Sequence, residues 1–155
     1  MKHCYEYPHP AVTVDIALFR KRGDSLEVLL IKRAKNPFKG KWAFPGGFVD
    51  ENEPLDVAAR RELEEETGLS GIDLTQFGAF GDPGRDPRGH TISIAYSGFV
   101  EDERAAAAAD DAEEAEWFPV DAPPELAFDH HKILAAALVH LPFVPGSRFQ
   151  VDPET

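Results

Sequence analysis

The sequence predicts an α/β fold, because segments with the pattern of β-strands and segments with the pattern of α-helices occur along one chain. Residues 11–20 (AVTVDIALFR) alternate and are rich in β-branched residues, and residues 26–33 (LEVLLIKR) read as their antiparallel partner across a turn. Residues 54–67 and 129–140 each carry helix start and stop signals. We therefore expect strands and helices that share one core.

Length and composition limit what the chain does. With 155 residues, 43% of them hydrophobic, we expect a single domain over residues 1–155 with its core at about 11–141. The net charge of −12 argues against a nucleic-acid partner, because phosphate backbones require basic patches. No apolar run approaches about 18 residues, no signal peptide is visible, and Cys4 is alone, so we expect a cytoplasmic protein without a membrane partner.

The helix at 54–67 has an unusual distribution of charge. Pro54 suits a first helical position, and Gly68 suits the left-handed residue that ends a helix. At about 100° per residue, an arc of roughly 120° holds three apolar and three acidic residues. These are Leu55, Ala58, Ala59, Glu62, Glu65 and Glu66. Carboxylates that face inward together repel each other unless they are protonated, paired or bound to cations, and clustered carboxylate oxygens are typical ligands of Mg²⁺ or Mn²⁺. A solvated acidic helix is the alternative on this pattern alone.

The spacing around this helix resembles the Nudix box. Gly47 is followed after five residues by Glu53 and, after seven more, by residues 61–69 (RELEEETGL). The pattern fixes about nine positions over 23, so a chance match in one short chain is very improbable. The resemblance implies the Nudix fold, a mixed β-sheet sandwiched between α-helices. It also implies a hydrolase that cleaves a nucleoside diphosphate linked to another moiety.

The resemblance also assigns roles within the box. It implies metal ligands on the helix and in the preceding loop: Glu62, Glu65, Glu66 and the main-chain carbonyl of Gly46. One of the glutamates serves as, or assists, the base that deprotonates water. Arg61 and Glu53 match positions that form an orienting ion pair. The implied cofactor is Mg²⁺, for which Mn²⁺ can substitute.

Residues 34–45 predict a loop and a short strand that lead into Gly46, with Trp42 and Phe44 in the core. Residues 72–100 predict a strand, a long loop and a second strand in which polarity alternates. The loop carries the sequence RDPRG at 85–89, where arginines held by proline and glycine suit bidentate binding of phosphate or ribose oxygens. An ordinary polar turn is the alternative for this loop.

Beside the box, two further stretches are similar to the ADP-ribose pyrophosphatase branch of the Nudix family. They are residues 84–90 (GRDPRGH) and residues 126–134 (LAFDHHKIL), so the resemblance covers roughly residues 11–140. It implies cleavage of ADP-ribose to AMP and ribose 5-phosphate, and it makes a homodimer an expectation by analogy. The candidate substrate-binding residues are Arg85, Asp86, Arg88 and Arg33. Arg33, at the end of a predicted strand, either reaches a phosphate or is a solvated edge charge.

The C-terminal third holds an acidic run and two short elements. Residues 101–116 are alanine-rich and acidic without an apolar face, which predicts a loop; Glu113 and Glu114 are candidates for an additional catalytic glutamate, and a solvating surface run is the alternative. Residues 116–120 predict a strand. Asp129 is expected to cap the last helix, and we expect His130 and His131 on its surface, without a chemical role.

Two alternative functions remain open. One is a different Nudix activity, on oxidised nucleoside triphosphates or NADH. The other is a non-catalytic, ADP-ribose-sensing regulator, which would carry a DNA-binding winged helix and often a degraded box. The intact box, the acidic charge and the short stretch after the last predicted helix favour the enzyme.

Overall fold

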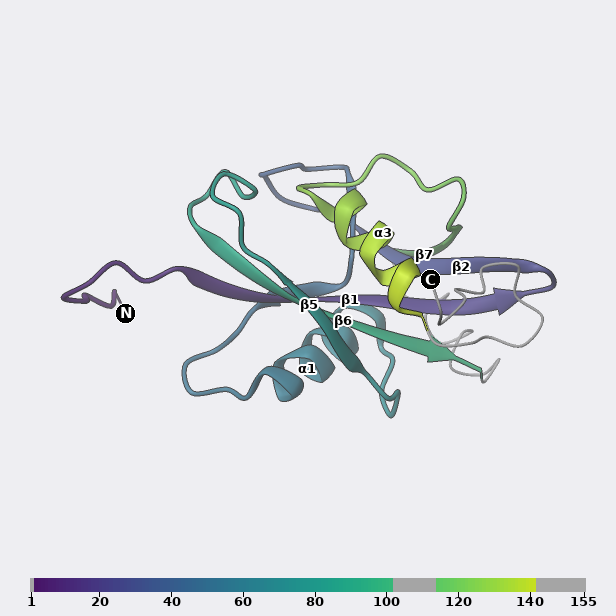
Figure 1. Ribbon diagram of the computed structural model, residues 1–155, viewed down its shortest axis with the longest axis horizontal. Helices are drawn as coiled ribbons and strands as arrows, with labels where there is room; N and C mark the ends of the chain where they lie inside the picture. The colour runs from purple at the N-terminus through teal and green to yellow at the C-terminus, as the bar shows by residue number, and fades with distance from the viewer. Residues whose placement is uncertain (1, 102–113, 142–155) are drawn as a thin grey trace.

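One mixed β-sheet of seven strands forms the centre of the protein (Figure 1). The computed structural model describes residues 2–101 and 114–141. Its elements in chain order are β1 (Ala11–Arg22), β2 (Ser25–Lys32), β3 (Trp42–Ala43), β4 (Gly46–Phe48), α1 (Leu55–Thr67), β5 (Thr75–Phe80), β6 (Thr91–Val100), β7 (Ala115–Pro119) and α3 (His130–His140). The sheet order is β3-β2-β1-β6-β5, with β4 beside β1 and β7 beside β2; β1 and β6 pair in parallel and the other neighbours are antiparallel.

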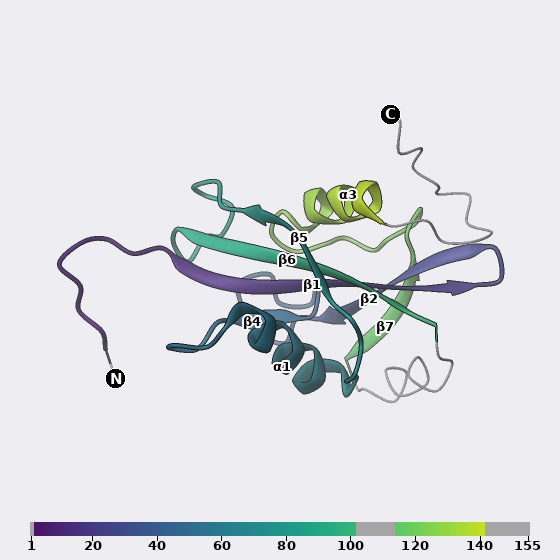
Figure 2. The same ribbon diagram turned by 60° about the horizontal axis from the view of Figure 1, so that its bottom comes forward.

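The two helices in the described part of the chain, α1 and α3, cover opposite faces of this sheet (Figure 2). Side chains alternate along β1, so Ile16 and Leu18 pack on the α1 side while Ala17 and Phe19 pack on the α3 side. Each face therefore has its own apolar cluster. The sandwich of a mixed sheet between helices that the sequence predicts is confirmed.

Helix α1 lies close to the sheet because its inner face is small. Ala58, Ala59 and Leu63 are buried there, and the hydroxyl of Tyr96 on β6 donates a 2.8 Å hydrogen bond to Asp56. The helix ends at Gly68, whose φ of 76° is a left-handed conformation that glycine adopts without steric cost. The predicted bounds of this helix are confirmed to within one residue.

Strand β1 changes its neighbour along its length. Residues Thr13–Asp15 pair with β4, whereas Phe19–Arg22 pair with β2. Asp15, a lone carboxylate in an apolar strand, lies at the last of the β4 pairings and opposite Gly46. The start of the Nudix-like box is thereby fixed beside the middle of the sheet.

Two expectations about the last helix are wrong. Asp129 stands at the N-cap position of α3, but its side chain makes no capping hydrogen bond, because it is engaged by Arg85. His130 is 3% exposed rather than on the surface. The expected apolar side of the helix is confirmed by the burial of Ile133 and Leu134.

Some expectations fall outside the described residues. Most of the acidic run 101–116 does so, including Glu113, whereas Glu114 is described and exposed just before β7. Among the described helices, none has both the length and the apolar character needed to cross a membrane.

Candidate active site

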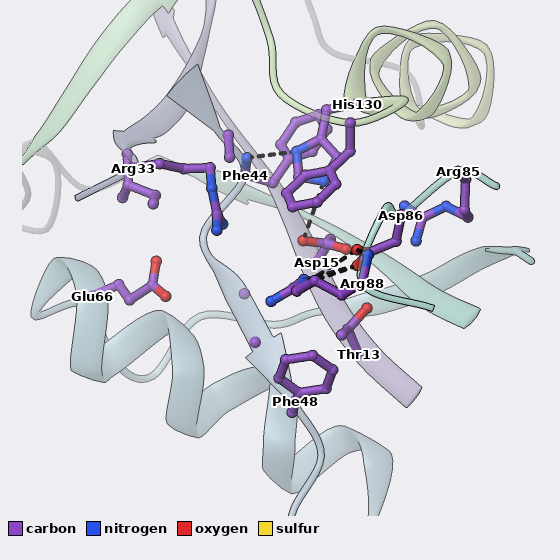
Figure 3. A pocket seen from close by; sticks show the side chains of 15 residues that line it. Thr13, Asp15, Arg33, Phe44, Phe48, Glu66, Arg85, Asp86, Arg88 and His130 are labelled. Atoms are coloured by element: carbon purple, nitrogen blue, oxygen red, sulfur yellow. Dashed lines mark hydrogen bonds and ion pairs between the residues drawn. The ribbon is translucent and has the colours of Figure 1, made fainter. Parts of the chain in front are cut away.

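A cavity of about 210 Å³ opens where β1, β4, the loop 81–90 and the start of α3 meet (Figure 3). Six of the predicted site residues line it: Arg33, Gly46, Glu66, Arg85, Asp86 and Arg88. Asp15, Phe48, Phe128 and His130 also line it. The chain therefore brings box residues and candidate substrate-binding residues, which are far apart in sequence, to one place.

Glu66 is the box carboxylate that faces this cavity. Burial, and then the negative charge of Glu62, raise the pKa of Glu66 to about 8, and the main-chain N–H of Gly46 opposes this shift only in part. Its Oε2 atom is buried and has no hydrogen-bond partner among the described residues. A buried carboxylate oxygen without a donor is costly. This oxygen therefore fits a hard divalent cation, which Glu62, Glu65 and the Gly46 carbonyl would help to hold.

The expected ion pair between Arg61 and Glu53 is present. The Arg61 Nε and Nη2 atoms donate hydrogen bonds of 2.7 and 2.8 Å to the two Glu53 carboxylate oxygens. The Arg61 hydrogen bonds, together with one from the Asp50 N–H, lower the pKa of Glu53 to about 2. Bidentate pairing of this kind fixes the geometry of both partners. It ties the loop before α1 to the helix.

Arg61 also holds the two remaining box glutamates. Its Nη1 donates to Glu62 at 2.8 Å and to Glu65 at 3.2 Å. The Glu65 side chain is 58% exposed, so the predicted inward orientation of this residue is wrong. Within the described parts of the chain, no three acidic, histidine or cysteine side chains converge closely enough to hold a metal ion as they stand. A cation bound by all three glutamates would have to compete with Arg61 for Glu62 and Glu65.

Gly47 provides the space in which the Glu62 carboxylate lies. A Cβ atom at Gly47 would lie 2.6 Å from Glu62 Oε1 and 2.7 Å from Glu62 Cδ. At Gly46, a Cβ would lie 2.1 Å from the main-chain oxygen of Val14, which cannot move without the sheet. The two glycines are thus required for different reasons, one for the site and one for the fold.

This difference gives a prediction for alanine substitutions. Because Gly47→Ala displaces only the end of a flexible side chain, we expect it to lower activity at least about 10-fold while thermal stability changes little. Gly46→Ala, the comparison variant, should lower the melting temperature strongly because it clashes with backbone. Steady-state kinetics and thermal unfolding of both variants test this, and equal melting temperatures for the two would contradict it.

The two arginines of the loop 81–90 differ in availability. Arg85 donates hydrogen bonds of 2.9 and 2.6 Å to the two carboxylate oxygens of Asp129 and one of 3.4 Å to the Thr91 carbonyl, and its side chain is 5% exposed. Every nitrogen of its guanidinium is therefore engaged, and we assign Arg85 a structural role. Arg88 pairs with the buried Asp86 at 2.8 Å but is 39% exposed. Arg88 is the better candidate for contact with a substrate.

Arg33 and Arg88 form a cationic rim around aromatic side chains. The Arg33 guanidinium lies 4.9 Å from the centre of the Phe128 ring, and the Arg88 guanidinium lies 4.8 Å from Phe48 and 5.4 Å from Phe128. Burial, and then the positive charge of Arg88, lower the pKa of Arg33. An anionic ligand at this rim would relieve the repulsion between the two arginines.

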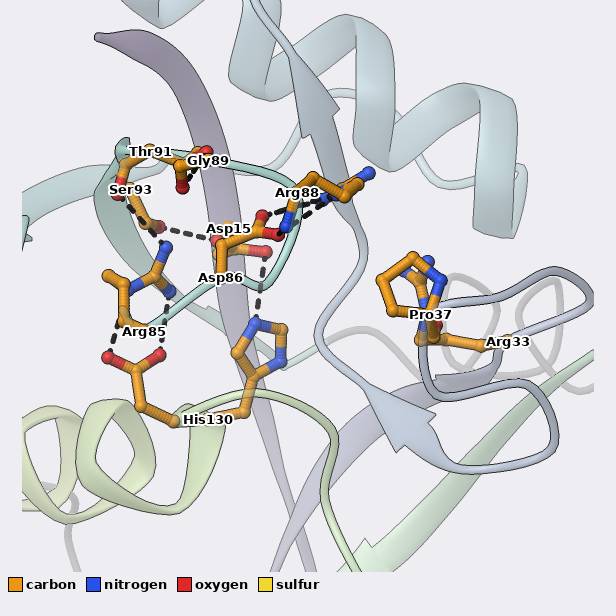
Figure 4. A network of polar contacts seen from close by, with 11 residues as sticks. Asp15, Arg33, Pro37, Arg85, Asp86, Arg88, Gly89, Thr91, Ser93 and His130 are labelled. Carbon is orange, nitrogen blue, oxygen red and sulfur yellow. Dashed lines mark hydrogen bonds and ion pairs between the residues drawn. The ribbon is translucent and has the colours of Figure 1, made fainter. Parts of the chain in front are cut away.

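Asp15, Ser93 and His130 form a polar group at the cavity that was not predicted from the sequence, and Figure 4 shows their contacts. The Ser93 hydroxyl donates a short hydrogen bond to Asp15 Oδ2, and His130 Nε2 lies 3.7 Å from Asp15 Oδ1. Asp15 carried one usable signal, because a carboxylate within a β-branched, apolar strand is rarely buried without a reason. His130 carried none, since it precedes another histidine at the start of a helix.

The sandwich fold and the acidic helix beside an arginine-rimmed cavity are features typical of a metal-dependent hydrolase of phosphate anhydrides. Residues 9–137 match the family model of the NUDIX domain. The chain belongs to the Nudix family.

Three known proteins show how this chain relates to the family. It is 47% identical over 128 residues to an ADP-ribose pyrophosphatase from Methanocaldococcus jannaschii. The aligned region covers 83% of this chain and 73% of that relative. It is 36% identical over 140 residues to the ADPR-responsive transcriptional repressor NtrR of Acinetobacter baylyi. That alignment covers 88% of this chain and 56% of the repressor. The NUDIX domain of Shewanella oneidensis NrtR, solved in complex with ADP-ribose, superposes with a TM-score of 0.72 at 29% identity, over 84% of this chain and 88% of that domain.

Proposed function

We propose that this Nudix hydrolase cleaves ADP-ribose to AMP and ribose 5-phosphate, with Mg²⁺ as its cofactor and with Mn²⁺ able to substitute for it. The observation that carries the proposal is the position of Glu66. Its side chain lines the first cavity and also a second one of about 380 Å³, which Lys32, Lys35 and Glu114 line as well. Arg33 borders both cavities. A substrate with two moieties joined by a diphosphate suits two cavities that share a carboxylate and an arginine.

Local charge supports an anionic substrate despite the acidic chain. Arg33 and Arg88 rim the first cavity, and Lys32 and Lys35 lie at the second. Guanidinium groups bind phosphate oxygens bidentately, so Arg33 is placed to hold the diphosphate between the cavities. The net charge of −12 therefore does not describe the site. Glu114 lies at the second cavity, and it stays a candidate for an additional catalytic glutamate.

The reaction adds water across the bond between one phosphorus and the bridging oxygen. A divalent cation, when bound at the box, neutralises phosphoryl charge and acidifies water. Glu66 would hold that cation, and one of the box glutamates would take the proton from water. Arg61 would position Glu62 and Glu65, and Glu53 would position Arg61.

The test of this proposal is product analysis under matched conditions. We expect AMP and ribose 5-phosphate to form from ADP-ribose in the presence of Mg²⁺, faster than products form from NADH or 8-oxo-dGTP. Saturating EDTA should abolish turnover, and Mg²⁺ added in excess should restore it. Chromatography of the nucleotide products measures all three substrates in the same way. Turnover of ADP-ribose that survives EDTA, or a clear preference for 8-oxo-dGTP, would contradict the proposal.

The similarity to a transcriptional repressor supports a second candidate, an ADP-ribose-sensing regulator domain. This chain spans 56% of the length of that repressor. A sensor would bind ADP-ribose without cleaving it. Tight DNA binding at moderate salt together with absent turnover would favour the regulator, whereas the acidic charge and the complete box favour the enzyme.

The assembly and location of the protein are part of the proposal. We propose a homodimer by analogy with the family, which light scattering after size-exclusion chromatography would test. The free and exposed Cys4 is compatible with a reducing, cytoplasmic location. We also propose that residues 1–155 fold as one domain, which predicts a single cooperative unfolding transition.

A further inference from the structure

The base of the first cavity carries a hydrogen-bond acceptor that the proposed chemistry does not use. Asp15 is 8% exposed, and it is among the residues that line the cavity. Ser93 satisfies Asp15 Oδ2, whereas Oδ1 accepts no hydrogen bond from any described residue. Oδ1 stays an acceptor in either protonation state, since the proton of the neutral acid can lie on Oδ2 and face Ser93.

A hydrogen-bond donor stands beside this acceptor. The Phe44 N–H donates a 3.1 Å hydrogen bond to His130 Nδ1, so Nδ1 carries the lone pair and Nε2 carries the proton of the neutral ring. Burial holds His130 neutral by lowering its pKa to about 3. The distance of 3.7 Å between Nε2 and Asp15 Oδ1 is too long for a hydrogen bond. Both atoms are therefore free to bind a ligand that presents a donor next to an acceptor.

The walls of the cavity suit a flat aromatic ligand. Phe44, Phe48 and Phe128 line it, and Arg88 lies near the rings of Phe48 and Phe128. Phe128 has a φ of 51°, a costly conformation for a bulky side chain, and such residues cluster where a site requires them. A volume of about 210 Å³ is below the range of about 300–1,000 Å³ of pockets that hold whole ligands, so this cavity holds one part of a larger one.

We propose that Asp15 and His130 read the adenine base of the substrate at the base of this cavity. Asp15 Oδ1 accepts a hydrogen bond from the 6-amino group, and His130 Nε2 donates one to a neighbouring ring nitrogen. Adenine presents this donor and acceptor side by side, and enzymes commonly read a base by such an edge while aromatic side chains stack on its faces. The ribose phosphate half then extends past Arg33 toward the second cavity. This inference rests on the proposed function, which supplies an adenosine substrate.

The test is a thermodynamic cycle between Asp15 and the 6-amino group, with binding measured by calorimetry on the full chain. The ligands are AMP and purine riboside 5′-monophosphate, which differ only in the 6-amino group. We expect the wild type to bind AMP about 10- to 100-fold more tightly, as a hydrogen bond to a carboxylate predicts. In Asp15→Ala this preference should vanish. In Asp24→Ala, the control variant in the exposed β1–β2 turn, it should persist.

A conservative variant of Asp15 and the tautomer of His130 test the two residues separately. If Asp15→Ala does not fold, Asp15→Asn keeps the shape of the side chain and should reduce the preference to less than about 10-fold, because a neutral acceptor binds more weakly. Nitrogen NMR should show His130 with Nδ1 unprotonated at neutral pH. A protonated Nδ1 would overturn the role given to His130.

Other outcomes separate this inference from the proposed function. It is overturned if the wild type binds both ligands equally, if Asp15→Ala keeps the preference, or if Asp15→Ala instead removes a preference for AMP over 2′-deoxy-AMP, which would place ribose at Asp15. If ADP-ribose is not cleaved but the AMP cycle behaves as expected, the proposed function fails and the base-reading role stands. If ADP-ribose is cleaved while the cycle shows no coupling between Asp15 and the 6-amino group, the proposed function stands and the base-reading role fails.

Discussion

Replacement of Glu66 by glutamine is expected to lower kcat for ADP-ribose by about 10²- to 10⁴-fold, the range for a residue that takes part directly in proton transfer or metal binding. Glutamine keeps the size of the side chain and removes the charge that a divalent cation requires. Glu64→Gln is the matched control, because Glu64 lies on the same helix but is exposed. Steady-state kinetics at saturating Mg²⁺ measure both variants. A Glu66→Gln enzyme within about 10-fold of wild type would contradict the role given to Glu66.

The same substitution should stabilise the metal-free protein at alkaline pH. The pKa of Glu66 is raised from 4.5 to about 8, so folding favours the protonated acid. The stability that this group contributes is fully present below pH 4.5 and is lost as the pH rises through about 8. Asp15, with a pKa raised to about 7 by burial, adds a loss of the same sign. The difference between wild type and Glu66→Gln isolates Glu66, and it should widen from pH 5 to pH 9 in chemical denaturation.

Added Mg²⁺ should make the wild type more stable than Glu66→Gln at alkaline pH, the reverse of the order without metal. A cation that binds the folded protein through the ionised Glu66 raises the stability of the wild type by mass action, and it should leave Glu66→Gln almost unchanged. Thermal unfolding at pH 8 with and without Mg²⁺ checks this. An equal gain in both proteins would show that the ion binds elsewhere.

Local signals explain why the helix and its box could be predicted from the sequence. Pro54 and Gly68 act through the backbone of their own segment, and the spacing of the glutamates is fixed by the helical repeat. The orientation of each glutamate was harder to predict from the sequence, because it depends on residues that are close in space. Arg61 donates a hydrogen bond to the exposed side chain of Glu65, whereas Glu66 is half-buried and lines the cavity together with Gly46.

The polar base of the cavity depends on contacts between distant segments. Asp15 and His130 meet only because β4 runs beside β1 and the Phe44 amide holds the imidazole. His130 was expected on the surface of its helix, but its contacts with the Phe44 amide and Asp15 bury it. A distant contact also explains Asp129. Its position predicts a capping role, but Arg85, 44 residues away in the sequence, binds its carboxylate instead.

The second large effect is expected at the ion pair between Arg85 and Asp129. Arg85→Met leaves Asp129 partly buried without its partner, and loss of one partner of a buried ion pair costs about 3–5 kcal/mol. For a domain of this size, that corresponds to a fall in melting temperature of roughly 6–20 °C. Burial alone would raise the pKa of Asp129, but the hydrogen bonds from Arg85 lower it, so the stabilisation is present at neutral pH and is lost as the pH falls below about 4. The surface pair of Lys41 and Glu125 is the control, and Lys41→Met should cost about 1 kcal/mol at most.

The double variant Arg85→Met with Asp129→Leu separates a structural from a substrate-binding role. Well-packed apolar residues replace a buried ion pair at little cost, so we expect most of the lost stability to return. If the only role of Arg85 is to hold the loop 81–90 against the start of α3, the folded double variant should also keep kcat and KM for ADP-ribose close to the wild-type values. Arg88→Ala should instead raise KM, because Arg88 is half-exposed at the rim of the cavity. A stable double variant with a KM raised more than about 10-fold would return Arg85 to the substrate-binding residues.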